Sequence, residues 1–200
     1  MTGSAFAALT VEVSGGPYQV NPGGEFTVTV TGSTIGSMPV GYQFQSFCLE
    51  RNETLTLGGT YYAVVNTAAV LGGQGGPSDP LSPQTAWLYN RFLDGSLPGY
   101  DYVSASGHED SAESLQNAIW DFEGEAATLD GRADLFQFLA NNLSGTDIGP
   151  VRVLNLYTDA ALTHRAQDIL ARPVPAPGGI LLVALGSACA GIVRRRRLVK

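Results

Sequence analysis

The residues of this chain that could carry nucleophilic chemistry are few. The 200-residue sequence contains two cysteines, Cys48 and Cys189, and two histidines, His108 and His164. A cysteine beside a histidine is the arrangement of a thiol hydrolase, in which the histidine activates the thiol. The sequence around Cys48 carries no known cysteine-protease signature, and His108 lies in the polar segment 107–110, which we interpret as a solvated loop. We therefore predict that the protein is not an enzyme and keep the thiol hydrolase as the enzymatic alternative.

Metal and nucleotide chemistry find little support in the sequence. His108, Glu109 and Asp110 are too few and too close together along the chain for a convincing metal site. No glycine-rich phosphate loop follows a predicted strand. We expect neither a metal nor a cofactor.

The C-terminal stretch decides how the remaining chemistry is interpreted. Val174-Pro175-Ala176-Pro177 is followed by sixteen uncharged residues, 178–193, and then by four arginines, 194–197. A membrane-spanning helix needs about 20 apolar residues, with a lower limit near about 17, and arginines directly after it favour a cytoplasmic C-terminus. We expect a single transmembrane helix that places everything upstream outside the cytoplasm. The alternative is a buried core helix of a soluble domain.

This tail resembles the PEP-CTERM sorting signal of Gram-negative bacteria, which combines a proline-containing motif, a short hydrophobic helix and an arginine-rich end. The residues that carry the resemblance are Val174, Pro175, Ala176, Pro177, Arg194, Arg195, Arg196 and Arg197. Ala176 stands where the family usually has glutamate. The resemblance implies recognition by an exosortase-type processing enzyme and an association with extracellular polymer and biofilm. We expect a precursor anchored in the inner membrane, followed by a place at the cell surface or in the extracellular matrix.

Charge and the N-terminal residues complete the domain organisation. Upstream of the tail, six arginines stand against eighteen acidic residues, a net charge of −12, which argues against nucleic acid and anionic membrane surfaces as partners.

Ala5-Phe6-Ala7 has the small-x-small pattern found at the end of a signal peptide, and we expect the true signal to lie upstream of Met1. We divide the chain into a remnant, 1–8, an exported domain, 9–172, and a sorting segment, 173–200.

The hydrophobic periodicity predicts strands, then helices, then strands, which is the order of an α+β domain. The alternation is clearest where Phe26, Val28 and Val30 share one face. Expected strands cover 9–13, 25–31, 42–49, 61–65, 151–157 and 166–171. Expected helices cover 83–93, about 110–122 and 132–141, the first of them capped by Ser82. The predicted fold is an antiparallel β-rich domain with an inserted group of about three helices, plus the C-terminal transmembrane helix.

Cys48 is the only cysteine upstream of the tail, and an exported domain usually pairs its cysteines. Phe47-Cys48-Leu49 and the segment 115–120, LQNAIW, resemble the two signature segments of bacterial thioester domains, which occur in surface adhesins, notably of Gram-positive bacteria. The resemblance implies that Cys48 supplies the sulfur and Gln116 the acyl carbon of an internal thioester. It also implies that an amine on a partner opens this bond and leaves a stable amide.

Further residues fit this interpretation. Gln116 lies one residue off the apolar stripe of its predicted helix, so its side chain can project toward a neighbouring strand. Phe47, Trp120 and Phe122 are candidates to shield the bond from water. Lys200 is the only lysine, so the exported part has no ε-amine that could consume its own thioester, although a genome rich in arginine and alanine would give the same absence.

We therefore predict an exported protein that attaches once, covalently, to an amine-bearing surface or matrix ligand. The alternative from a different class is a non-covalent structural or biofilm matrix protein, sorted by an exosortase, in which Cys48 is only a small buried hydrophobe.

Overall fold

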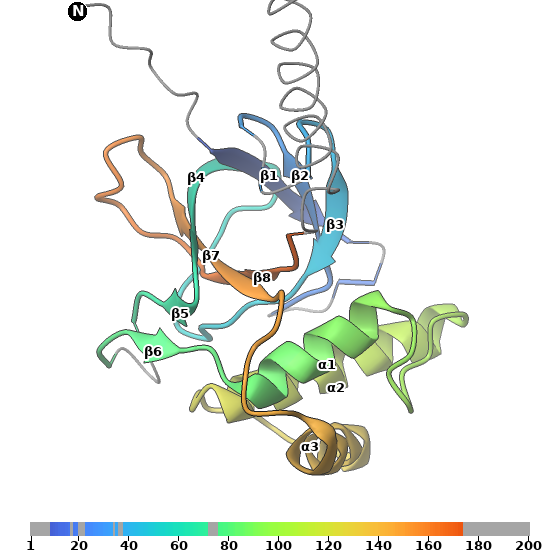
Figure 1. Ribbon diagram of the computed structural model, residues 1–200. Helices are drawn as coiled ribbons and strands as arrows, with labels where there is room; N and C mark the ends of the chain where they lie inside the picture. Colours follow the sequence, from blue (N-terminus) through green and yellow to red (C-terminus); the bar gives the residue numbers. More distant parts are fainter. Residues whose placement is uncertain are drawn as a thin grey trace, which may run out of the picture.

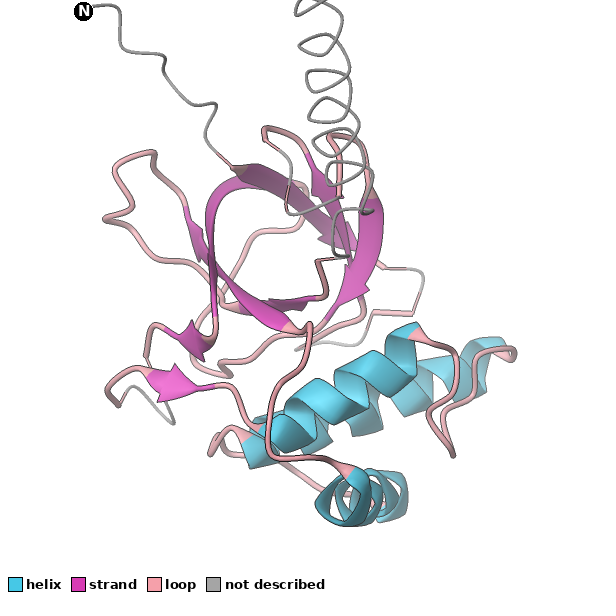
Figure 2. Ribbon diagram, viewed as in Figure 1, coloured by secondary structure: helices cyan, strands magenta, loops and turns pink. Residues whose placement is uncertain are grey.

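The computed structural model describes residues 9–16, 18–19, 23–33, 35, 38–71 and 76–173. Within them, antiparallel strands and three helices form an α+β domain, as predicted (Figures 1 and 2). The elements are β1 (Thr10–Gly15), β2 (Phe26–Val30), β3 (Gln43–Ser46), β4 (Gly59–Asn66), β5 (Ala68–Ala69), β6 (Asp79–Pro80), α1 (Pro83–Leu93), α2 (Ala105–Phe122), α3 (Gly131–Leu143), β7 (Arg152–Tyr157) and β8 (Ile169–Ala171).

The expected sorting motif, the hydrophobic stretch and the arginines all lie outside the described residues, as does the remnant 1–8. Across the part of the chain that the structure describes, no helix has the length and apolar content needed to cross a membrane.

Six antiparallel strands follow one another in the order β3-β2-β1-β4-β7-β8 and curl into a nearly closed barrel (Figure 1). The segment after β3 closes it, because Leu49 donates its N–H to the Asp168 carbonyl at 2.9 Å and Leu170 donates to the Phe47 carbonyl at 3.2 Å. Cys48 therefore lies opposite Ile169 in an antiparallel bridge. We call this contact between residues 47–49 and 168–170 the seam.

The predicted alternation in β2 is confirmed. Phe26, Val28 and Val30 are buried inside the barrel, and the register pairs Val28 and Val30 with Val13 and Val11 of β1. Inward-facing β-branched and aromatic side chains suit a pleated strand with one buried face. The barrel interior forms one of the two core clusters.

The three helices form a layer on one side of the barrel (Figure 2). Helix α1 has the predicted bounds, and Ser82 caps it by accepting the Thr85 N–H on its hydroxyl at 3.0 Å. Helix α3 is capped by Asp130. The second core cluster fills the space between the helices and the barrel; its largest fully buried members include Phe47, Leu88, Tyr89, Leu115, Ile119 and Phe136.

The predicted start of the second helix is wrong. Helix α2 begins at Ala105, about five residues early, because Ser104 serves as its N-cap and accepts the Gly107 N–H at 3.2 Å. Asp101 in turn accepts the N–H groups of Val103 and Ser104 on one carboxylate oxygen. His108 consequently lies in the helix and is buried, whereas the sequence had suggested a solvated loop.

Two expected strands are also shorter than predicted. The strand expected over 42–49 ends at Ser46, and its last residues form the seam instead. The last strand begins at Ile169 rather than Ala166. The short pair β5 and β6 was not expected from the sequence, because two-residue strands carry no periodic signal.

Candidate functional site

The fold brings Gln116 of α2 against Cys48 at the barrel seam. The side chain of Gln116 is 1% exposed, and its amide forms two hydrogen bonds with the Cys48 backbone. Its Oε1 accepts the Cys48 N–H at 3.0 Å, and its Nε2 donates to the Cys48 carbonyl at 2.9 Å. Two residues far apart in sequence are thus held in direct contact, on elements from different layers.

A second backbone N–H points at the same glutamine oxygen. Gly24, just before β2, donates to Gln116 Oε1 at 3.0 Å. The orientation of the amide is fixed by these partners, because two donors face the oxygen and one carbonyl faces the nitrogen. The carbonyl of Gln116 is consequently polarised by two N–H groups in a buried setting, where hydrogen bonds are electrostatically stronger than in water.

Gly23 and Gly24 make this approach possible. A Cβ on Gly23 would lie 2.7 Å from Gln116 Cγ, and the residue has φ +142°, which favours glycine. A Cβ on Gly24 would lie 2.6 Å from the Ser46 carbonyl and 3.1 Å from Phe47 Cδ1. Only a backbone without side chains fits between Gln116 and the segment that carries Cys48.

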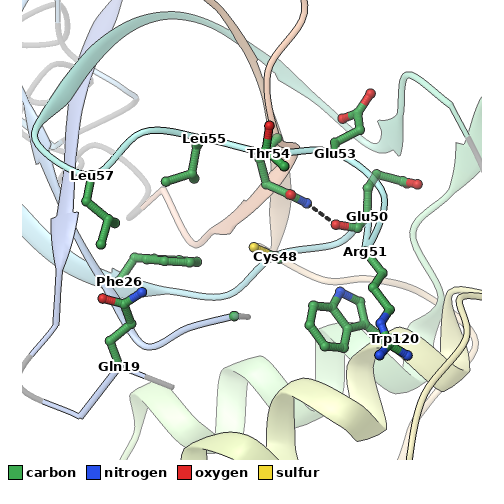
Figure 3. Close-up of a pocket in the computed structure, with 12 residues that line it drawn as sticks. Gln19, Phe26, Cys48, Glu50, Arg51, Glu53, Thr54, Leu55, Leu57 and Trp120 are labelled. Carbon is green, nitrogen blue, oxygen red and sulfur yellow. Dashed lines mark hydrogen bonds between the residues drawn. The ribbon is translucent and has the colours of Figure 1, made fainter. Parts of the chain in front are cut away.

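The Cys48 side chain faces a cavity of about 210 Å³. In Figure 3 its sulfur lies among Phe26, Leu55 and Trp120, while the carboxylate of Glu50 points away from it. The full lining is Gln19, Gly23, Phe26, Cys48, Glu50, Arg51, Glu53, Thr54, Leu55, Leu57, Trp120 and Gln167. The sulfur therefore faces a small cavity beside the seam, with a lining of both apolar and polar side chains.

Burial governs the ionisation of the groups around this cavity. It raises the pKa of the Cys48 thiol, which favours the neutral form. It also raises the pKa of Glu50 to about 9, with the neighbouring Glu125 contributing, and that of Glu53 to about 7, with Asp168 contributing. Two carboxyl groups of the cavity lining, Glu50 and Glu53, thus resist ionisation.

The three candidate shielding residues occupy different places. Trp120 is 4% exposed, lines the cavity and carries the Arg51 guanidinium 5.5 Å above its ring. Phe47 is fully buried on the helix side, with its ring edge-on to Phe92 at 5.0 Å between centroids. Phe122 packs partly buried against that same helix-side core. Of the three, Trp120 is the one beside the sulfur.

The histidines belong to other sites. Neither lines the cavity among the described residues. His108 Nε2 lies 2.6 Å from Glu25 Oε1 in a buried pair, and His164 is exposed and contacts Asp159. Within the described ranges, no group of three or more His, Cys, Asp or Glu residues could hold a metal ion.

Sequence reasoning missed the residues that hold Gln116. No role in the site was predicted for Gly23 and Gly24, although a glycine pair directly before a buried strand can indicate a close backbone approach. Glu25, which starts the otherwise alternating segment 25–31, is buried at 3% exposure. Its position directly before a buried strand was the sequence signal that Glu25 could be buried, and a buried carboxyl needs a partner.

Comparisons with known proteins give no relative for this chain: no family model, no curated protein and no solved structure matches it.

Proposed function

We propose that the domain forms an internal thioester between Cys48 and Gln116 and uses it once, to attach itself covalently to an amine on a surface or matrix partner. The observation that carries this proposal is the Gln116 carbonyl oxygen, which accepts the N–H groups of Cys48 and Gly24 at 3.0 Å each. The amide to be attacked belongs to the residue that is hydrogen-bonded to the backbone of the cysteine, and its oxygen is already held by two donors.

The first step is an exchange at the glutamine amide carbon. The Cys48 sulfur adds to Gln116 Cδ, and negative charge develops on Oε1, where two backbone N–H groups already stand. Such preorganised donors are a major source of stabilisation in acyl transfer. The C–N bond then breaks, the thiol proton leaves with the nitrogen, and the products are a thioester and one ammonia.

Burial of the sulfur is compatible with the product. The apolar surroundings that raise the pKa of the Cys48 thiol penalise a thiolate, because a charge is costly to desolvate. The neutral thiol and the thioester sulfur are both uncharged, so neither carries this penalty. A buried site is also hard for water to reach, which protects an acyl group from hydrolysis.

The second step consumes the bond. An amine of the partner adds to the same carbon, the C–S bond breaks, and an amide forms while Cys48 recovers its proton as a thiol. The reaction needs no oxidant and no cofactor. Because the amide product is stable, each domain attaches a single time.

The same contacts also favour a second candidate, a non-covalent structural protein. A buried glutamine that hydrogen-bonds both backbone groups of Cys48 satisfies polar groups that would otherwise be costly to bury. In this case Gln116 is a clamp that fastens α2 to the seam, and Cys48 is a small buried side chain.

Intact mass separates the two candidates. The thioester form is lighter than the sequence mass by one ammonia, and it has no titratable thiol on Cys48 until an amine is added. Incubation with methylamine should restore the thiol and add the mass of methylamine. A domain with the full sequence mass and a free Cys48 thiol would defeat the covalent proposal and leave the clamp.

We propose in addition that the C-terminal segment sorts the domain to the membrane and then to the surface. The support is the order of the prolines, the uncharged stretch 178–193 and Arg194 to Arg197. Deleting 178–200 should release an amine-reactive domain into the periplasm or the medium. A truncated protein that stays in the membrane fraction would contradict an anchor, and a tail lost only in cells with an exosortase would identify a processed signal.

A further inference from the structure

A second buried polar cluster lies next to the glycines that face Gln116. Glu25 Oε1 accepts the Tyr100 hydroxyl at 2.5 Å and lies 2.6 Å from His108 Nε2. All three side chains are buried. The Tyr18 ring covers the imidazole in a stacked contact, 3.7 Å between centroids. We call Glu25, His108 and Tyr100 the latch.

The hydrogen-bond partners determine how the latch is arranged. A carboxylate oxygen only accepts, so the Nε2–H tautomer lets His108 donate to Glu25. His108 Nδ1 is buried without a partner among the described residues, which suits the bare acceptor nitrogen of that tautomer better than an unpaired N–H. Burial, with the Glu25 charge contributing, raises the pKa of Tyr100 and keeps its hydroxyl as a donor. Two donors therefore hold one carboxylate oxygen.

The position of the latch along the chain gives it a second role. Glu25 directly follows Gly24, whose N–H donates to Gln116 Oε1. Glycines have no side chains with which to hold their own conformation, and they are conformationally permissive. The first anchored side chain after Gly23 and Gly24 is that of Glu25, so its attachment fixes where the Gly24 N–H points.

Helix α2 carries both contacts. His108 and Gln116 are eight residues apart on it, which corresponds to about 12 Å along the helix axis. The strand entering the barrel thus touches α2 at two separate points, one through Glu25 and one through Gly24. These two hydrogen-bonded points add to the apolar packing of α2 and fix its position along the chain that enters the barrel.

We propose that Glu25, His108 and Tyr100 are positioning residues for the thioester reaction, because they hold the Gly24 N–H on the oxygen of Gln116. This inference rests on the proposed function for its effect on the reaction, whereas its effect on Gly24 is independent of it. The latch residues act through Gly24 and do not contact the reacting atoms themselves.

The rate of bond closure tests the first part. Ammonia opens the proposed thioester and regenerates the glutamine amide, and closure after its removal is followed by intact mass and thiol titration. His108→Leu, which lacks a donor, should slow closure roughly tenfold to a hundredfold, the range expected for a small misplacement of reacting groups. His108→Gln keeps a side-chain N–H and should recover most of the rate. Tyr100→Phe removes one hydroxyl and should lie between them.

A stability-matched control separates positioning from general damage. Val11→Ala removes apolar volume from a fully buried residue of β1 that lies outside the latch and the seam. It should lower Tm without slowing closure. If Val11→Ala slows closure as much as His108→Leu at equal loss of Tm, or if His108→Gln is as slow as His108→Leu, the latch is an ordinary part of the core and the inference is overturned.

Amide hydrogen exchange tests the second part in a chain that cannot form the bond. In Cys48→Ala, the Gly24 N–H should exchange slowly, and adding His108→Leu should speed it by about tenfold or more, whereas adding His108→Gln should not. Unchanged exchange overturns the latch even where the thioester forms. Faster exchange in Cys48→Ala/His108→Leu, together with an unmutated protein that keeps its full sequence mass, supports the latch and defeats the proposed function, so the two can fail separately.

Discussion

Two buried glutamines hold the chain that follows β3, and they do so with different atoms. Gln116 of α2 uses both ends of its amide on Cys48 and accepts a further N–H from Gly24. Gln167, just before β8, is 2% exposed and uses its nitrogen, which donates to the carbonyls of Glu50 and Asp168. One amide has its oxygen held by two donors, and the other fastens neighbouring backbone through its nitrogen.

The difference teaches how a reactive amide can be told from a structural one. Donors on a carbonyl oxygen stabilise the charge that appears during nucleophilic addition. An amide N–H that meets a carbonyl satisfies that carbonyl and does nothing for the acyl carbon. Gln167 even lines the cavity that the Cys48 sulfur faces. The comparison therefore predicts that proximity to the sulfur alone does not select the acyl donor.

The largest expected effect is the loss of amine capture when Cys48 or Gln116 is replaced by alanine, with Gln167→Ala as the contrast. Cys48→Ala and Gln116→Ala should abolish covalent capture of methylamine, because each removes one of the two atoms that form the bond. Gln167→Ala should lower stability by about 1–3 kcal/mol, since it leaves a buried carbonyl unpaired, and should keep full capture. Intact mass after incubation with methylamine measures capture in all three variants. An adduct in Gln116→Ala, or no adduct in Gln167→Ala, would contradict the assignment of Gln116 as the acyl donor and Gln167 as a structural residue.

The next largest effect concerns Gly24, whose N–H donates to the Gln116 oxygen. Gly24→Ala should slow bond closure by more than tenfold, as loss of an oxyanion donor does, because the new methyl would lie 2.6 Å from the Ser46 carbonyl and displace the N–H. Its stability cost should be about 1–3 kcal/mol. Gly131→Ala is the control, since its Cβ would meet nothing within 4 Å. Closure at the normal rate in Gly24→Ala would show that its N–H is not required.

A smaller effect should appear as pH dependence of stability on the Gln167 side. Folding raises the pKa of Glu50 to about 9 and of Glu53 to about 7, both from 4.5. At a pH between 4.5 and the raised pKa of each group, the folded protein holds a proton that the unfolded chain has released. Stability must therefore fall as pH rises from about 5 to 9. Asp101 and Asp159 have lowered pKa values of about 2, so their contribution to stability is constant over this range and is lost only in acid.

Thermal denaturation at pH 5, 7 and 9 measures this dependence. Glu50→Gln cannot ionise and should flatten the decline in Tm by a few degrees. Asp134→Asn, on the first turn of α3, is a control that should leave the slope unchanged. A wild-type Tm that rises from pH 5 to 9 would show that the carboxyl groups near the seam are ionised and stabilised in the folded protein.

The smallest effect is expected for Trp120→Phe. The indole N–H has no partner among the described residues, so the exchange loses little hydrogen bonding and keeps an aromatic ring beside the sulfur. We expect a cost of about 1 kcal/mol and little change in the rate of amine capture. Trp120→Ala, in contrast, should cost about 3–5 kcal/mol and speed hydrolysis of the thioester. A loss of capture in Trp120→Phe would mean that the indole N–H takes part in the reaction.

The sequence predicts the regular parts of the fold because periodicity and caps are local signals. The alternation of Phe26, Val28 and Val30 and the Ser82 cap predict β2 and α1 correctly. The Ser104 cap of α2 is a local signal too, but it was missed because the first turns of the helix are polar and lack an apolar stripe. The burial of His108 in these turns could not be predicted locally, because its partner Glu25 is far away in sequence.

The candidate site likewise has a part that the sequence predicted and a part that it did not. Gln116 was expected to reach a strand carrying Cys48, and its amide contacts the Cys48 backbone just after β3. The donors on its oxygen were not predicted, because a backbone N–H carries no identity in the sequence and Gly24 is one of 25 glycines. The buried acidic groups around Glu50 were also missed, since burial of a carboxyl follows from barrel closure rather than from its neighbours along the chain.

The seam has a mechanical consequence. A ligand bound through Gln116 would pull on α2, whereas an anchor beyond residue 173 would pull on β8, the strand that pairs with Cys48. Tension between partner and cell would therefore cross the joint made by the Leu49–Asp168 and Leu170–Phe47 backbone bonds and by the Ser46 hydroxyl, which donates to the Leu170 carbonyl at 2.6 Å. Under load, the strength of the tether would be set by the closure of the barrel, and the amide formed with the partner would outlast it.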